Sequence, residues 1–183
     1  MIAGVKSSAE KIKTLNTLTR QYPQSNMVPD VNMEIANTYI ADEKFSDAIP
    51  YLDKLLQDPN AEGLRPAVYM KLGLSYYNIN DNKRALDNYQ ALIQKYPQSP
   101  EADDAMDIMK NIYVEDGRPN EYVELMRKYG KNISVSEADS LTYTAAEIKY
   151  NANDCTNAIA GFNNYLQQYP NGAYAIEANY FRS

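Results

Sequence analysis

Few side chains in this sequence have the chemistry that most catalytic sites require. The chain contains no histidine and a single cysteine, Cys155. It therefore lacks the residues for histidine acid–base catalysis, for a cysteine–histidine nucleophile and for the usual zinc sites. It also contains no phosphate-binding glycine loop, no dinucleotide-binding glycine motif and no C-x-x-C pair. We expect no catalytic residue, no cofactor and no metal.

One acidic motif stands apart from this pattern. Asp103, Asp104 and Asp107 spell D-D-x-x-D, and helical spacing puts Asp103 or Asp104 on the same face as Asp107. The motif resembles the magnesium-diphosphate site of prenyl-transferring enzymes, which need a second acidic cluster across an apolar cavity. Acidic residues are also favoured at the start of any helix, because they complement the helix dipole. We interpret the motif as a helix start and keep a magnesium-dependent diphosphate enzyme as an alternative.

The composition predicts one soluble domain or one array of repeats. Of 183 residues, 44% are hydrophobic and 23% are charged, and the net charge is −6. No uninterrupted apolar run exceeds four residues, which argues against direct membrane insertion. The acidic balance argues against a nucleic-acid partner, because binding phosphates requires a basic surface. The first six residues contain no apolar stretch typical of a secretory signal.

The tyrosines reveal an internal repeat. There are 17 of them and no tryptophan, and Tyr39, Tyr76 and Tyr113 are 37 residues apart. The segment Tyr-Pro-Gln-Ser at 22–25 returns at 96–99, and a Tyr-Pro pair recurs near the end. Apolar positions between these markers have helical spacing, and each Tyr-Pro stops a helix because proline disfavours helical geometry in the residue before it. Each repeat is therefore predicted to be two helices joined by a turn.

The second repeat carries the signature of a known family. It resembles the tetratricopeptide repeat at seven positions: Tyr69, Leu72, Gly73, Tyr76, Ala85, Tyr89 and Pro97. The family's repeat has about 34 residues, and the extra residues here lie in the junction around Tyr96, which resembles bacterial envelope members such as the Tol-associated periplasmic coordinator and the outer-membrane assembly lipoprotein. The resemblance implies an all-α, right-handed α-solenoid of about four helix–turn–helix repeats with partial repeats at both ends. It also implies a fragment of a larger array in the bacterial periplasm or cell envelope.

The repeats divide residues 1–183, a single array, into successive segments. These are the second helix of a truncated repeat at 9–23, repeat 1 at 29–60, repeat 2 at 66–97, repeat 3 at 103–130, repeat 4 at 139–170 and the first helix of a truncated repeat at 173–183. Repeat 3 is expected to be irregular, because Lys110 and Tyr122 replace the small residues where its two helices approach. Its second helix is predicted over about 119–129. Ser136 and Asp139 fit a capping box before repeat 4, in which Lys149 takes the place of the signature tyrosine.

The resemblance implies a non-catalytic protein–protein interaction module that binds a peptide on a concave face lined by the first helices, as a scaffold or adaptor within a larger protein. The family's groove positions correspond to Met33, Asn37, Met70, Leu74, Tyr77, Asn78, Asp107, Asn111, Val114, Tyr143, Glu147, Tyr150 and Asn151. Aromatic and methionine side chains at these positions offer apolar area, and the asparagines could bind a peptide backbone. Asp107 and Glu147 would favour a basic group. We expect a protein or peptide partner of basic and aromatic character.

An architectural role is the main alternative to groove binding. The array would then be a spacer, or would self-associate through its ends, with the groove empty. Apolar residues on both end helices support this reading, because a cut solenoid exposes faces that neighbouring repeats would cover. The expected self-association contacts are Leu15, Leu18 and Phe181.

Overall fold

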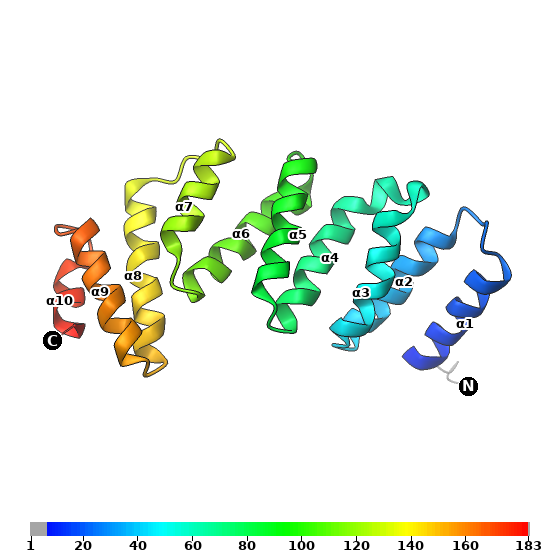
Figure 1. Cartoon of the computed structure of the whole chain (residues 1–183), viewed down its shortest axis with the longest axis horizontal. Coiled ribbons are helices and arrows are strands. Elements are labelled where there is room, and N and C mark those ends of the chain that lie inside the picture. The colour runs from blue at the N-terminus through cyan, green and yellow to red at the C-terminus, as the bar shows by residue number, and fades with distance from the viewer. Residues whose placement is uncertain (1–6, 183) are drawn as a thin grey trace, which may run out of the picture. The chain divides into compact units, whose positions relative to one another are not determined.

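The computed structural model describes residues 7–182, and every regular element in this range is a helix (Figure 1). Residues 1–6, which we searched for a secretory signal, and residue 183 lie outside the described residues. The fold class is the predicted one, an all-α solenoid of tetratricopeptide type. In chain order the elements are α1 Ser8–Gln21, α2 Val28–Ala41, α3 Phe45–Gln57, the 3-10 helix η1 Pro59–Leu64, α4 Arg65–Asn78, α5 Asn82–Lys95, α6 Pro100–Glu115, α7 Pro119–Lys128, α8 Val135–Asn151, α9 Cys155–Gln168 and α10 Ala175–Phe181.

Turns of one geometry join α2 to α3, α4 to α5, α6 to α7 and α8 to α9. Each contains one residue in the left-handed region: Glu43, Asn80, Gly117 and Asn153, with φ of 58°, 61°, 76° and 60°. The next residue donates its N–H to the carbonyl five residues earlier, at 2.7 to 2.9 Å, which is the bond of a Schellman helix end. Glycine and asparagine adopt this conformation at least cost. Because these residues are 37, 37 and 36 positions apart, the turns fix which residues of the repeats are equivalent.

The Tyr-Pro markers end three helices in the same way. α1, α5 and α9 stop just before Tyr22, Tyr96 and Tyr169, whose φ values are −129°, −134° and −128°. Each of these tyrosines donates its N–H to the carbonyl four residues earlier, at 2.8 to 2.9 Å. The following proline cannot continue the helix, so the local sequence sets these ends, as predicted.

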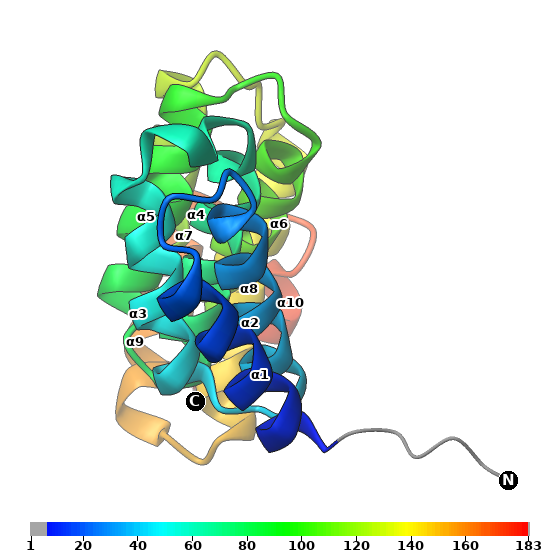
Figure 2. The same ribbon diagram turned by 90° about the vertical axis from the view of Figure 1, so that its right-hand side faces the viewer.

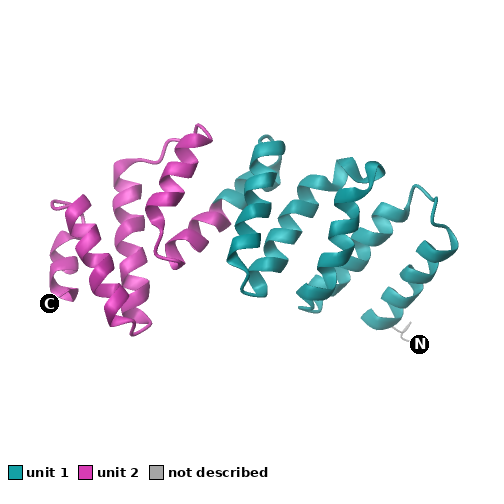
Figure 3. Cartoon of the chain, viewed as in Figure 1, with its two compact units in different colours: residues 1–106 teal, residues 107–183 magenta. Residues whose placement is uncertain are grey.

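The chain forms two compact units, residues 1–106 and 107–183 (Figure 3). Unit 1 contains α1 to α5 and the beginning of α6. Helices α2 and α3 lie side by side in Figures 1 and 2, and α4 packs against α5 in the same manner. The side chains that fill this unit include the fully buried Ile35, Leu52, Leu55, Leu72, Tyr89 and Leu92.

Unit 2 contains the rest of α6 and α7 to α10, with α8 paired to α9 and α10 packed on α9. Its core cluster consists of Tyr143, Ala146, Ala158, Phe162, Tyr165 and Ala178. Two bonds secure the turn before α10: Asp139 Oδ2 accepts from the Ala173 N–H at 2.9 Å, and the Tyr165 hydroxyl accepts from the Tyr174 N–H at 3.0 Å. Burial, reinforced by Asp139, raises the pKa of Tyr165 to about 12.

The second helix of the third repeat is short. α7 has 10 residues, whereas α5 and α9 each have 14. It ends at Lys128, before Gly130, whose φ of +73° favours glycine. Tyr122 is buried with its ring 6.4 Å from that of Tyr113, and burial, then nearby carboxylates, raises its pKa to about 12. Tyr122 therefore places a bulky side chain at a position that is alanine in α5 and α9.

One local prediction needs correction. The capping residue of α8 is Ser134, whose hydroxyl accepts from the Glu137 N–H at 3.1 Å, and not Ser136. Ser134 and Glu137 form their own S-x-x-E pattern two residues earlier, so Ser136 lies inside the first turn and Asp139 is left free to bind Ala173. The sequence also gave no indication of η1, in which Ala61 is fully buried.

Candidate protein-binding site

The first helices of unit 1, α2 and α4, carry matched side chains on one face. Met33 and Met70, Asn37 and Leu74, and Ile40 and Tyr77 are pairs separated by 37 residues, and all six are half-buried. Both helices pack against α3 and η1, and the turns that end them are equivalent. We call these six residues the unit 1 first-helix face.

This face is uncharged and contains one side-chain amide, that of Asn37, with a second, that of Asn78, next to it in sequence. Asn37 has a buried Oδ1 atom with no hydrogen-bond partner in the described part of the chain. Asn78, at the end of α4, is exposed and donates its amide to the Leu74 carbonyl at 2.9 Å. An apolar surface that also holds amides is suited to a peptide, because peptide groups need hydrogen-bond partners once water is removed.

The predicted residues on α6 are less suited to binding. Asp107 and Asn111 are exposed, but the Asp107 carboxylate already pairs with the Lys110 ammonium at 3.1 Å. Val114 is only 5% exposed, so little of its side chain is available to a ligand. It ends a run of three buried residues, 112–114.

The predicted residues on α8 are largely taken up by α10 and the turn before it. Tyr143 is 6% exposed and stacks on Tyr174 with ring centroids 4.5 Å apart, so it belongs to the core of unit 2. Burial, then Glu147 at 3.5 Å from the hydroxyl, raises its pKa. Tyr150 is 44% exposed, yet its ring lies 4.6 Å from that of Phe181. Asn151, at the end of α8, is exposed as well.

The acidic motif gains no support from its surroundings. Asp103, Asp104 and Asp107 are all exposed, and within residues 7–182 no group of three acidic, cysteine or histidine side chains is placed to hold a metal ion. No helix in this same range is long and apolar enough to span a membrane.

Comparison with known families agrees with this geometry. A family model for YfiO, an outer membrane lipoprotein, matches residues 5–115, which is more than half of the chain. The chain belongs to this family. A tetratricopeptide repeat model matches residues 139–172, which hold most of α8 and all of α9. No curated protein matches the chain.

Membership of the YfiO family carries functional information. Both matched families typically consist of non-catalytic interaction modules, which indicates a role in protein–protein interaction. The YfiO match also points to the bacterial envelope. The suspected resemblance to envelope proteins with tetratricopeptide repeats is thereby confirmed.

The end helices expose apolar side chains, in part different from those predicted. Leu18 is 42% exposed, whereas Leu15 is half-buried and Phe181 packs against Tyr150 and Phe162. The most exposed apolar residues of α10 are Ile176, at 84%, and Tyr180, at 76%. Sequence reasoning missed Ile176 and Tyr180 because spacing alone does not show which residues of a short helix are exposed to solvent.

Sequence reasoning also missed a cavity in unit 2, of about 360 Å³, lined in part by Thr142, Lys149, Asn157 and Asn164. Substitutions in α8 pointed to it, among them Lys149, which stands where the repeat signature has tyrosine. A missing aromatic side chain predicts a gap only if nothing else fills it, and that depends on the three-dimensional packing.

Proposed function

We propose that this protein binds a partner's peptide segment on the unit 1 first-helix face. The observation that carries the proposal is the matched set of half-buried, uncharged side chains on α2 and α4, led by Met33, Met70 and Tyr77. In a repeat array such a face runs continuously from one repeat to the next, and extended or helical peptides commonly occupy it. Family membership supports the same role.

The chemistry of this face favours an apolar or aromatic segment. Methionine side chains adapt to ligands of different shape, and the amides of Asn37 and Asn78 suit a peptide backbone. The face itself holds no charge, so any preference for basic flanks comes from the net charge of −6, which steers cations at long range. We place this interaction in the periplasm, in accordance with the outer membrane family.

Site-specific photocrosslinking in the bacterium that makes the protein tests this proposal. A photoreactive phenylalanine analogue replaces Ile40 or Met70 on the face, and Asp53 or Asp87, exposed on α3 and α5, in matched controls. We expect a discrete protein adduct from positions 40 and 70 only. Adducts of equal yield from all four positions, or adducts from 53 and 87 alone, would contradict the proposal.

Self-association through α10 is the second candidate, favoured by the exposure of Ile176 and Tyr180. A concentration series in analytical ultracentrifugation should show a dimer or larger species, and Ile176→Glu with Tyr180→Glu should abolish it. A parent protein that stays monomeric throughout the series would exclude this candidate.

A further inference from the structure

A cavity of about 360 Å³ lies in unit 2 between the α6–α7 turn and the α8–α9 pair. Its lining includes Ala145, Ala146 and Gly161, which we call its floor, and Lys149 and Asn157, which lie near the turn between α8 and α9. Its volume falls within the lower range of small-ligand pockets. It involves none of the residues of the unit 1 first-helix face.

Comparison with the α4–α5 pair explains why this space is open. The two pairs correspond with an offset of 73 residues: α5 and α9 have identical lengths, and the left-handed Asn80 corresponds to Asn153. By the same offset, three bulky residues of α4 become smaller or polar in α8. They are Tyr69, Leu72 and Tyr76, which become Thr142, Ala145 and Lys149.

In α4 these bulky side chains fill the corresponding space. Leu72 and Tyr76 are 1% and 8% exposed, and the Arg84 guanidinium lies over the Tyr76 ring at 4.5 Å. In unit 2 the residue equivalent to Arg84 is Asn157. The cavity therefore lies at the position that the Tyr76 ring and the neighbouring Arg84 guanidinium fill in the α4–α5 pair.

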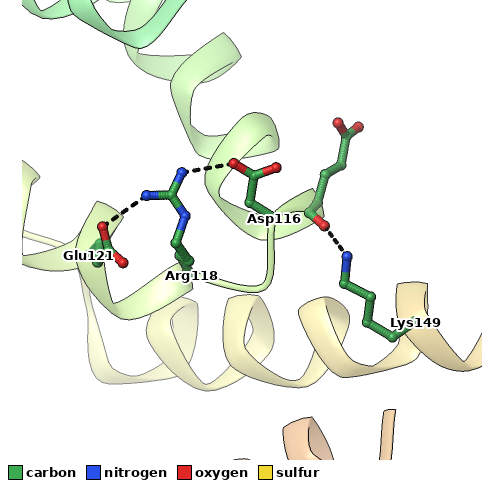
Figure 4. A network of polar contacts seen from close by, with 5 residues as sticks. Asp116, Arg118, Glu121 and Lys149 are labelled. Carbon is green, nitrogen blue, oxygen red and sulfur yellow. Dashed lines mark hydrogen bonds and ion pairs between the residues drawn. The ribbon is translucent and has the colours of Figure 1, made fainter. Parts of the chain in front are cut away.

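The cavity is held open by rigid contacts. A Cβ atom on Gly161 would lie 2.8 Å from the Ala146 Cβ, so α8 and α9 already touch at the floor and cannot close further. Lys149 Nζ donates to the Glu115 carbonyl at 2.7 Å and ties α8 to the end of α6 (Figure 4). Beside it, Arg118 bridges Asp116 and Glu121 at 2.8 and 3.1 Å (Figure 4), whereas Lys149 pairs with a neutral carbonyl and keeps its charge.

Polar groups line the walls at a spacing that suits a peptide. Asn157 donates its Nδ2 to Asp154 Oδ2, and Asn164 accepts with its Oδ1 from Gln168, so the Asn157 Oδ1 acceptor and the Asn164 Nδ2 donor take no part in these two bonds. These asparagines are seven residues apart on α9, or about 10 Å along the helix axis. That distance matches about three residues of an extended peptide.

We propose that this cavity receives an aromatic side chain, tyrosine above all, from a segment of a protein partner. The ring would lie on the alanine and glycine floor in place of the missing Tyr76 equivalent, Lys149 would supply the neighbouring cation, and the two asparagines would hold the flanking backbone. Other ligand classes fit less well. The walls carry no aromatic side chain for stacking on a sugar, and a single lysine is too few cations for a nucleotide.

The test uses the whole protein and two capped pentapeptides that differ at one position. One has a central tyrosine flanked by serine and glycine, and the other has leucine there. Titration followed by ¹⁵N NMR should shift the amide signals of Ala145, Gly161 and Asn164 with the tyrosine peptide, which should bind about tenfold more tightly than the leucine peptide. No shift at these amides, or equal binding of the two peptides, would overturn the proposal.

Two variants and a control sharpen the result. Ala145→Leu with Lys149→Tyr places the corresponding α4 residues, leucine and tyrosine, inside the cavity. Ala160→Phe blocks the rim of the cavity from an exposed position. If the first variant fails to fold, the second still tests the proposal. Each should weaken binding of the tyrosine peptide at least tenfold. Asp87→Ala, exposed on α5 in unit 1 and outside both proposed sites, should leave this affinity unchanged, which shows that the loss is specific to the cavity. Undiminished binding by the Ala160→Phe variant would also overturn the proposal.

Discussion

The α4–α5 and α8–α9 pairs share one framework and fill it differently. Their turns, helix ends and second-helix lengths correspond residue by residue. In α4–α5 the glycine of closest approach is on the first helix, where Gly73 faces the Tyr89 ring; in α8–α9 it is Gly161, on the second helix, facing Ala146. Turn and cap residues thus fix the backbone in both pairs. The glycine that permits close packing can be on either the first or the second helix. The space left over differs accordingly, and unit 2 has a cavity where α4 has tyrosine.

The largest effect should come from the glycine of the first pair. A Cβ atom on Gly73 would lie 2.3 Å from the Tyr89 ring, and that ring is fully buried. Gly73→Ala should therefore destabilise the protein by about 3 kcal/mol through overpacking, although alanine is the better helix former by about 1 kcal/mol. Urea unfolding monitored by circular dichroism measures the change. A stabilised variant would mean that Tyr89 does not pack against this position.

The glycine of the second pair offers a rescue experiment. Gly161→Ala should cost about 2 kcal/mol, because the new methyl group meets Ala146. Adding Ala146→Gly moves the glycine to the helix that carries it in α4, and should recover about 1 kcal/mol of that loss. Additive losses in this double-mutant cycle would show that the two positions do not share one contact.

The junction after each pair is the next point of difference. Asp139, in α8, accepts from the Ala173 N–H at 2.9 Å and is 7% exposed, whereas the equivalent residue in α4 is Pro66, whose side chain has no such acceptor. Asp139→Ala should cost about 1 to 2 kcal/mol, because a backbone donor loses its partner. Hydrogen exchange should speed up at residues 173–175 and stay unchanged in unit 1. A uniform change throughout the chain would contradict a local role.

The smallest effect concerns the hydroxyl of Tyr89. It is buried without a hydrogen-bond partner in the described residues, and its equivalent in α9 is Phe162. Tyr89→Phe should be neutral or stabilising by up to about 1 kcal/mol, as thermal unfolding at pH 7 would show. Substantial destabilisation would mean that the hydroxyl has a partner.

The same substitution should alter the response to alkali. Burial raises the pKa of Tyr89, and it raises the pKa of Tyr122 and Tyr165 to about 12. The folded protein therefore keeps protons on these tyrosines that the unfolded chain releases from about pH 10. The free energy of unfolding should keep its full value below pH 10 and fall as the pH rises towards 12. The fall should be less steep in Tyr89→Phe.

Local chemistry explains which structural predictions succeeded. The Tyr-Pro stops and the helical spacing of apolar residues depend on residues close together in the sequence, and they predicted the fold class. The α8 cap was misplaced because two overlapping patterns competed and the earlier one, at Ser134, prevailed. Tyr143 and Val114 have suitable spacing for a groove, but their burial depends on packing by residues that repeat position does not identify. The cavity likewise depends on side chains from α6, α8 and α9 together.

Methyl NMR of the methionines tests the central claim most directly. The protein, labelled at its methionine methyl groups, is titrated with peptides selected from a random library for binding to it. We predict that the signals of Met33 and Met70 shift and saturate together, while that of Met126, which is 1% exposed in unit 2, stays in place. If none of the selected peptides moves the signals of Met33 and Met70, binding on the unit 1 first-helix face is contradicted.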